Sequence, residues 1–144
     1  MHFDLNPFDS IHTHSNVMDG HDIIGSSGST LGHTEPNVLG GVNTYNNHGQ
    51  MIDHTEPNVF GGFNEINHHG LMSGHTEPNL FGGNNHYDSI GHLNHHTEPN
   101  VLGGSNIVDQ HGMIIAQSHP NVMGGMDIDP LRTFHSNNIP DFLI

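Results

Sequence analysis

Cysteine, tryptophan and lysine are absent from this chain of 144 residues, and arginine occurs once, at Arg132. The absence of cysteine excludes disulfide bonds and thiolate zinc sites. One basic side chain against 15 carboxylates gives a formal charge of -14 when histidine is neutral. This charge disfavours nucleic acids and anionic membranes as partners, because binding either of them requires cationic side chains that neutralise phosphates. The expected partner is therefore a protein, either a second copy of this chain or another one.

Long apolar segments are also missing. Val, Ile, Leu and Phe occupy 35 of 144 positions, a share just above the roughly 20% below which disorder becomes the default. No segment approaches the roughly 20 apolar residues of a membrane helix, and the first residues lack the basic and apolar parts of a signal peptide. We therefore expect a cytoplasmic protein by default, with disorder as an alternative to a folded core.

Histidine and glycine are abundant, with 17 and 19 residues, and much of this enrichment belongs to an internal repeat. Four segments read HTEPN followed by two apolar residues and Gly-Gly, and two altered copies flank them. Their shared asparagines recur every 21 residues: Asn16, Asn37, Asn58, Asn79, Asn100 and Asn121. We define six repeats: 12–32, 33–53, 54–74, 75–95, 96–116 and 117–137. A constant period predicts that successive repeats occupy equivalent environments.

The repeats are expected to form β-strands and turns, because Gly or Pro interrupts every segment long enough for a helix. NNHG and its equivalents are typical of a type I turn closed by a left-handed glycine, which folds a hairpin. TEPN is the expected second connection, since its proline presets a turn. The predicted fold is all-β: an array of six β-hairpin units, or alternatively a three-cornered β-solenoid.

The two ends of the chain break the period and carry more large apolar residues. A stacked array exposes an apolar or unpaired face at each end, and atypical terminal segments usually cover it. We therefore predict an N-terminal cap over residues 1–11. A C-terminal cap begins near residue 131 and continues into the apolar tail 138–144.

The repeat resembles that of small bacterial proteins whose units read roughly Y-D-x-x-G, then S-x-P-N-x-x-G-G. The best match runs from Tyr87, Asp88 and Gly91 to the segment containing Pro99, Asn100, Gly103 and Gly104. The resemblance covers residues 12–125 and departs from the pattern in its histidine content and in having Asn or Gly where Asp is usual in the first three copies. It implies a repetitive β-hairpin architecture and a bacterial source, with no activity attached.

Histidine supplies the candidate metal ligands. A column at the repeat period contains His33, His54, His75 and His96, begins at His12 and ends in Gln117; His14 forms an H-x-H pair with His12. Neutral imidazole binds zinc, nickel and copper, so these ions are the candidate cofactors. Equivalent histidines would lie about 4.8 Å apart in a solenoid and roughly 9.6 Å apart in a hairpin array. The alternative is that histidine is a polar residue beside the turns, hydrogen-bonded to neighbouring Thr or Glu.

Two further columns have structural interpretations. The apolar pairs before Gly-Gly, such as Val38 with Leu39 and Val59 with Phe60, are the most regular apolar positions and are predicted to form the core. Glu35 and its equivalents Glu56, Glu77 and Glu98 form an acidic column that could orient the imidazoles.

Catalysis has little support in the sequence. An active site requires different groups in different roles, whereas these polar residues recur in every repeat, and no catalytic motif is present. We therefore expect no enzymatic activity. The favoured hypothesis is a structural or interaction protein that associates through strand edges, in a pH-dependent way, or presents a repeated face to a partner. The alternative is a module that binds or buffers transition metals.

Overall fold

A computed structural model describes residues 10–131, which form twelve β-strands and no helix. The strands are β1 (Ile11–Ser15), β2 (His21–Gly25), β3 (Thr30–Pro36), β4 (Val42–Asn46), β5 (Met51–Pro57), β6 (Phe63–Asn67), β7 (Met72–Pro78), β8 (Asn84–Asp88), β9 (Leu93–Pro99), β10 (Ser105–Asp109), β11 (Ile114–Pro120) and β12 (Met126–Pro130). Each repeat supplies most of one odd-numbered strand and the whole even-numbered strand that follows it, and each odd-numbered strand from β3 on begins in the last residues of the preceding repeat. Within this part of the chain, no helix of the length and apolarity needed to cross a membrane occurs.

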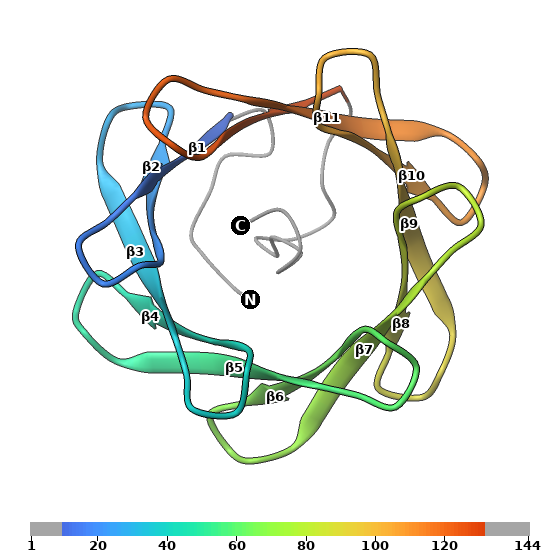
Figure 1. The fold of residues 1–144 in the computed structure, drawn as a ribbon, viewed down its shortest axis with the longest axis horizontal. Helices are drawn as coiled ribbons and strands as arrows, with labels where there is room; N and C mark the ends of the chain where they lie inside the picture. Colours follow the sequence, from blue (N-terminus) through green and yellow to red (C-terminus); the bar gives the residue numbers. More distant parts are fainter. Residues whose placement is uncertain (1–9, 132–144) are drawn as a thin grey trace.

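The strands close into a single barrel (Figure 1). Each strand pairs antiparallel with its sequence neighbours, and β1 completes the ring by pairing with β12. The predictions of an open hairpin array and of a solenoid are therefore both wrong, although the all-β character is right. Neighbouring strands twist and tilt in a constant direction, and after six equal hairpins this brings the last strand beside the first.

The shorter turns confirm the predicted turn chemistry. In the turn between β4 and β5, the backbone N–H of Gly49 donates to the Asn46 carbonyl oxygen at 3.1 Å. Asn46 Oδ1 accepts hydrogen bonds from the backbone N–H groups of His48 and Gln50, at 2.9 and 3.0 Å. Gly49 has φ 79°, a left-handed conformation that a side chain would strain. This connection is therefore specified by an asparagine, two intervening residues and a glycine.

The longer turns begin later than the sequence suggested. Thr34, Glu35 and Pro36 continue β3, and the chain reverses over the five residues from Asn37 to Gly41. Proline tolerates this place because it is the last residue of the strand. A Cβ atom on Gly41 would overlap the backbone carbonyl of Thr55 in the next repeat. The second glycine of the pair therefore permits the close approach of adjacent repeats.

The inner face of the barrel has an apolar cluster on one side, while buried polar residues occur on both sides, Thr13 and Ser118 among them. Buried residues alternate along the strands, which in a closed barrel places them on the inner face. On β1, β2 and β10–β12 they include Ile11, Ile23, Ile107, Ala116 and Ile128, which form the apolar core. On β3–β5, β8 and β9 they include Thr34, Thr44, Asp53, His86, His95 and Thr97.

The two ends of the barrel differ. The six Asn-containing long turns lie at one end, because each connects an odd strand to the following even strand. The opposite end carries the shorter turns, and there the chain enters β1 and leaves β12. The predicted caps lie outside the described residues, except for Ser10 and Ile11 at the start and Leu131 at the end. Ile11 is already part of β1.

Candidate binding surfaces

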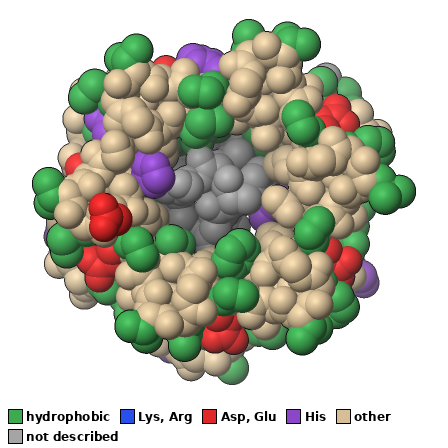
Figure 2. All heavy atoms as spheres, viewed as in Figure 1, with side chains coloured by type: hydrophobic (Ala, Val, Ile, Leu, Met, Phe, Trp, Pro, Cys, Tyr) green, Lys and Arg blue, Asp and Glu red, His purple; other side chains and the backbone are tan. Residues whose placement is uncertain are grey.

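Twelve apolar side chains stand on the six long turns, and we call them the apolar crown. The first of each turn are Val17, Val38, Val59, Leu80, Val101 and Val122, with 94–103% of their surface exposed; the second are Met18, Leu39, Phe60, Phe81, Leu102 and Met123, with 53–64% exposed. The prediction that these positions form the core is wrong, although the six environments are equivalent as predicted. Figure 2 shows hydrophobic side chains spaced around the rim.

The turn asparagine explains this exposure. Asn37 Oδ1 accepts hydrogen bonds from the backbone N–H groups of Leu39 and Gly41, both at 3.0 Å. Asn37 Nδ2 donates to the Thr55 carbonyl oxygen of the next repeat at 2.9 Å. The amide thus fills the inside of the turn, and Val38 and Leu39 have no place there. A polar anchor therefore holds each apolar pair in contact with water.

The predicted histidine column lies on the outer wall. The rings of His33 and Tyr45 stack with centroids 4.9 Å apart, and those of His75 and Tyr87 with centroids 4.8 Å apart. The ring of Phe81 covers His96 at 5.6 Å. His33 and His96 thus each lie against one aromatic ring, and His75 lies against both Tyr87 and Phe60. These three imidazoles contribute to the packing of the outer wall.

The column does not gather into one site. His54 pairs with Asn43 on one side and Ile66 on the other, so an intervening strand separates it from the next histidine of the column. Neighbouring acids lie beside individual histidines: Glu77 is 3.5 Å from His75 and Glu98 is 3.8 Å from His96. Between Ser10 and Leu131, no three His, Cys, Asp or Glu side chains are arranged to hold a metal ion as they stand.

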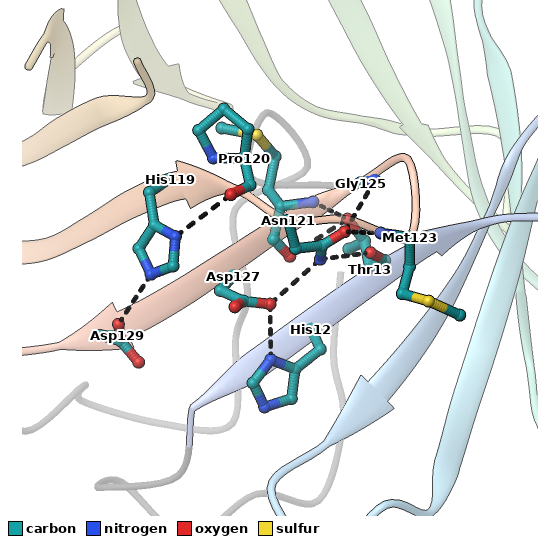
Figure 3. A network of polar contacts seen from close by, with 10 residues as sticks. His12, Thr13, His119, Pro120, Asn121, Met123, Gly125, Asp127 and Asp129 are labelled. Carbon is teal, nitrogen blue, oxygen red and sulfur yellow. Dashed lines mark hydrogen bonds and ion pairs between the residues drawn. The ribbon is translucent and has the colours of Figure 1, made fainter. Parts of the chain in front are cut away.

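The closure of the barrel carries a polar network that Figure 3 shows at close range. Asp127 on β12 pairs in register with His12 on β1 and with His119 on β11. His12 Nδ1 and Asp127 Oδ1 are 2.7 Å apart, and Asn121 Nδ2 donates to the same oxygen at 3.0 Å. The hydrogen bond from His12 is the main reason that the pKa of Asp127 lies below its usual value. His119 Nε2 lies 3.6 Å from Asp129 Oδ2.

A second histidine pair lies inside the barrel. His86 on β8 and His95 on β9 are cross-strand partners whose rings stack with centroids 4.5 Å apart. The pKa of His86 is lowered to about 2 and that of His95 to about 4, mainly by burial, with a smaller contribution from the charge of His95 on His86 and of His96 on His95. Both are therefore neutral near pH 7. Burial also raises the pKa of Asp53 on β5, and the charge of Glu65 adds to this effect.

Sequence reasoning overlooked several residues of these surfaces. His119 and the two aspartates Asp22 and Asp127 depart from their repeat columns, and comparing the six copies position by position would have identified them. His86 and His95 fall outside the main histidine column, and their burial required the barrel itself. The crown was identified as a regular column but assigned to the core.

Comparison with known proteins gives a fold neighbour and no family. No family model matches the chain, and no curated protein matches it. An X-ray structure of a protein from Arabidopsis thaliana is similar, with a TM-score of 0.66 and 9% sequence identity over 88% of this chain and 83% of that chain. At this identity the likeness concerns the fold alone. The resemblance to bacterial repeat proteins stays a prediction.

Proposed function

We propose that this protein is a non-enzymatic interaction protein that associates with a second copy of itself through the apolar crown. The observation that carries the proposal is the exposure of Val17 and its five equivalents, which is at least 94% at every turn. Soluble monomers rarely expose large apolar surfaces, and such surfaces usually mark a binding site.

The area of the crown is adequate for a specific interface. Each Val, Leu, Met or Phe side chain offers roughly 100 Å² of apolar surface, so twelve offer on the order of 1,000 Å². A specific interface buries about 800 Å² on each partner. The crown turns also contain a single charged residue, Asp19, so few charges would lose water on association.

The sixfold spacing of the turns favours a second copy as the partner. The crown repeats six times around a closed ring, with one pair of apolar side chains at each long turn. Two crowns that face each other across a twofold axis perpendicular to the barrel axis would bring the apolar pairs of one copy against those of the other. Such an arrangement is self-complementary, as a twofold interface requires.

Association through strand edges, which the sequence suggested, has lost its physical basis. Every described strand has a partner on both sides, because β1 pairs with β12. A closed barrel offers no unpaired row of backbone groups for another chain to extend. The composition still favours an effect of pH, because histidine as a residue type gains a proton between about pH 7 and 5. The net charge of -14 then becomes less negative, which weakens the repulsion between copies.

Sedimentation velocity over a range of protein concentrations tests this proposal. We expect a dimer at pH 7 that becomes tighter as the pH falls toward 6. The triple variant Val38→Ser, Leu80→Ser, Val101→Ser should be monomeric. A matched control places Ile90→Ser and Leu71→Ser at the opposite end, where these side chains are 74% and 65% exposed, and should leave the dimer unchanged.

Two outcomes would overturn the proposal. The first is a wild-type chain that stays monomeric at every concentration and pH, which would leave the crown to a different partner. The second is a dimer that the control variant disrupts and the crown variant does not. Circular dichroism of each variant should match the wild type, since none of these side chains is buried.

A further inference from the structure

The first and last repeats differ from the four middle repeats at two outer-wall positions. Where the middle repeats have Glu35, Glu56, Glu77 and Glu98, the outer two have His14 and His119. Where the middle repeats have Asn43, Asn64, Asn85 and Asn106, the outer two have Asp22 and Asp127. Both substitutions occur together in both repeats. The exchange of Asn for Asp replaces an amide with a carboxylate, which is a better ligand for a transition metal. The exchange of Glu for His gives the row a second imidazole in place of a carboxylate.

The register of the barrel brings these residues into two rows. In the first row, Asp22 on β2 pairs with His14 on β1 and with His33 on β3. In the second row, Asp127 on β12 pairs with His119 on β11 and with His12 on β1. Each row thus reads His, Asp, His across three adjacent strands. The closure of the barrel is needed for the second row, because its members come from opposite ends of the chain.

We propose that each row binds one divalent transition-metal ion, such as zinc, through two imidazole nitrogens and the carboxylate between them. Two histidines and one carboxylate are a common set of protein ligands for such ions. A middle repeat offers Glu, Asn and one His in the same places, which is a weaker set for these metals. The inference differs from the predicted histidine column, since it leaves His54, His75 and His96 out of the ligand sets and adds Asp22, Asp127 and His119.

The contacts around the carboxylates support this assignment. Asn16 Nδ2 donates to Asp22 Oδ1 at 3.3 Å, and Asn121 Nδ2 donates to Asp127 Oδ1 at 3.0 Å. Each carboxylate is therefore oriented by the asparagine of its own turn, as hydrogen-bond partners orient metal ligands in known sites. The turn asparagines of middle repeats make the same contact with Asn43, Asn64 and Asn85, so the two rows differ in carrying a carboxylate at this oriented position. In the second row, His12 already engages Asp127 at 2.7 Å.

Access to the side chains also fits binding. Asp22 and His33 line an open depression on the surface together with Ser15, Asn16, Val17 and Met18. The side chains of His12 and Asp127 are 35% and 26% exposed. To surround an ion, the imidazoles must turn toward the central carboxylate, and His33 must leave its stack on the ring of Tyr45. A turn of this kind is a change of side-chain rotamer and does not require the strands to move.

Titration calorimetry with zinc on the full chain, purified without an affinity tag, tests the inference. We expect two ions per chain. Asp22→Asn and Asp127→Asn should each remove one ion or weaken its binding at least about tenfold, and the double variant should lose both. These substitutions introduce the residue that the four middle repeats hold, so the fold should be retained. His14→Gln and His119→Gln each remove one imidazole without supplying a carboxylate, and should give the same result.

A control at the middle repeats separates the two rows from the histidine column. The double variant His54→Asn, His75→Asn should bind two ions as the wild type does. The absorption spectrum of bound cobalt should report nitrogen and oxygen ligands, and should disappear in the Asp22→Asn, Asp127→Asn variant. The inference is overturned if that variant retains both ions, if the control loses them, or if the wild type binds zinc no better than a middle-repeat histidine does. Crown variants leave both rows intact, so this test is independent of the proposed dimer.

Discussion

Asn121 Nδ2 donates to the carbonyl oxygen of Thr13 at 2.9 Å, although the two residues are 108 positions apart. The same hydrogen bond joins Asn37 to Thr55, and there the two residues are 18 positions apart. Thr13 Oγ1 likewise accepts the backbone N–H of Met126 at 2.8 Å, as Thr55 Oγ1 accepts that of Val42 at 3.0 Å. The last repeat therefore forms the same asparagine and hydroxyl hydrogen bonds with the first repeat as any repeat forms with the next, although β12 and β1 pair over two residues where β2 and β3 pair over three.

This equivalence predicts equal costs for removing the asparagine at the closure and within the ring. Asn121→Ala and Asn58→Ala should each lower the free energy of unfolding by about 2–3 kcal/mol, because each removes several hydrogen bonds worth roughly 1 kcal/mol. Urea unfolding followed by circular dichroism measures both. A much smaller effect for Asn121→Ala would mean that the barrel is open between β1 and β12.

Removal of one whole repeat should prevent folding into a stable monomer. A chain that lacks residues 54–74 has ten strands, and closing ten strands requires a different tilt and curvature. The turns and asparagine bonds of this protein fit the curvature of twelve. We expect loss of cooperative thermal unfolding or association into larger species, measured by calorimetry and light scattering. A monomeric variant that unfolds cooperatively at the wild-type temperature would contradict the fixed curvature.

The glycines of the short turns and the second glycines of the Gly-Gly pairs should respond differently to substitution. At Gly91, φ is 87° and the space around a Cβ atom is open, so Gly91→Val should cost on the order of 1–3 kcal/mol through backbone strain alone. At Gly62, a Cβ atom would overlap the carbonyl of Thr76. Gly62→Ala should therefore be more destabilising than Gly91→Ala. Thermal melts of the two alanine variants compare them directly, and the reverse order would show that the repeats can separate without cost.

The buried pair His86 and His95 predicts a loss of stability in mild acid. An unfolded histidine has a pKa near 6.5, whereas burial lowers these two to about 2 and about 4. Between about pH 6.5 and 4 the unfolded chain binds protons that the folded chain does not. The free energy of unfolding should therefore be greatest above pH 6.5 and fall as the pH decreases through this range.

The fifth repeat provides a control for the histidine pair. Its Ile107 and Ala116 pair across the strands at the same inner positions as His86 and His95. The double variant His86→Ile, His95→Ala should show a smaller loss of stability between pH 7 and 4.5 in urea titrations. If its pH dependence equals that of the wild type, other groups are responsible for acid unfolding.

Local features of the fold could be predicted from the sequence, and closure could not. The spacing of Asn46 and Gly49 specifies a hairpin turn within a few residues, because the side chain and the glycine conformation act locally. One repeat does not determine how many repeats close the barrel. That number depends on the small twist between neighbouring strands, summed over the whole sheet.

The apolar residues were misleading for a physical reason. Val38 and Leu39 recur with greater regularity than the buried isoleucines, and regular apolar positions usually form a core. Here the regularity belongs to the turn, where Asn37 occupies the inside and leaves both side chains in water. The inner face varies from repeat to repeat, from Ile107 on one side to Asp53 on the other. Which residues line the inner face depends on how the strands pair around the barrel, and one repeat does not specify that pairing.

The position of the chain ends relative to the long turns has a practical consequence. Ile11 and Pro130, where the described chain enters and leaves the barrel, lie at the end opposite the apolar crown. A tag joined directly before Ile11 or directly after Pro130 would therefore leave the barrel on the side away from the crown. A protein immobilised on a bead or sensor through such a tag presents its six turns to a binding partner.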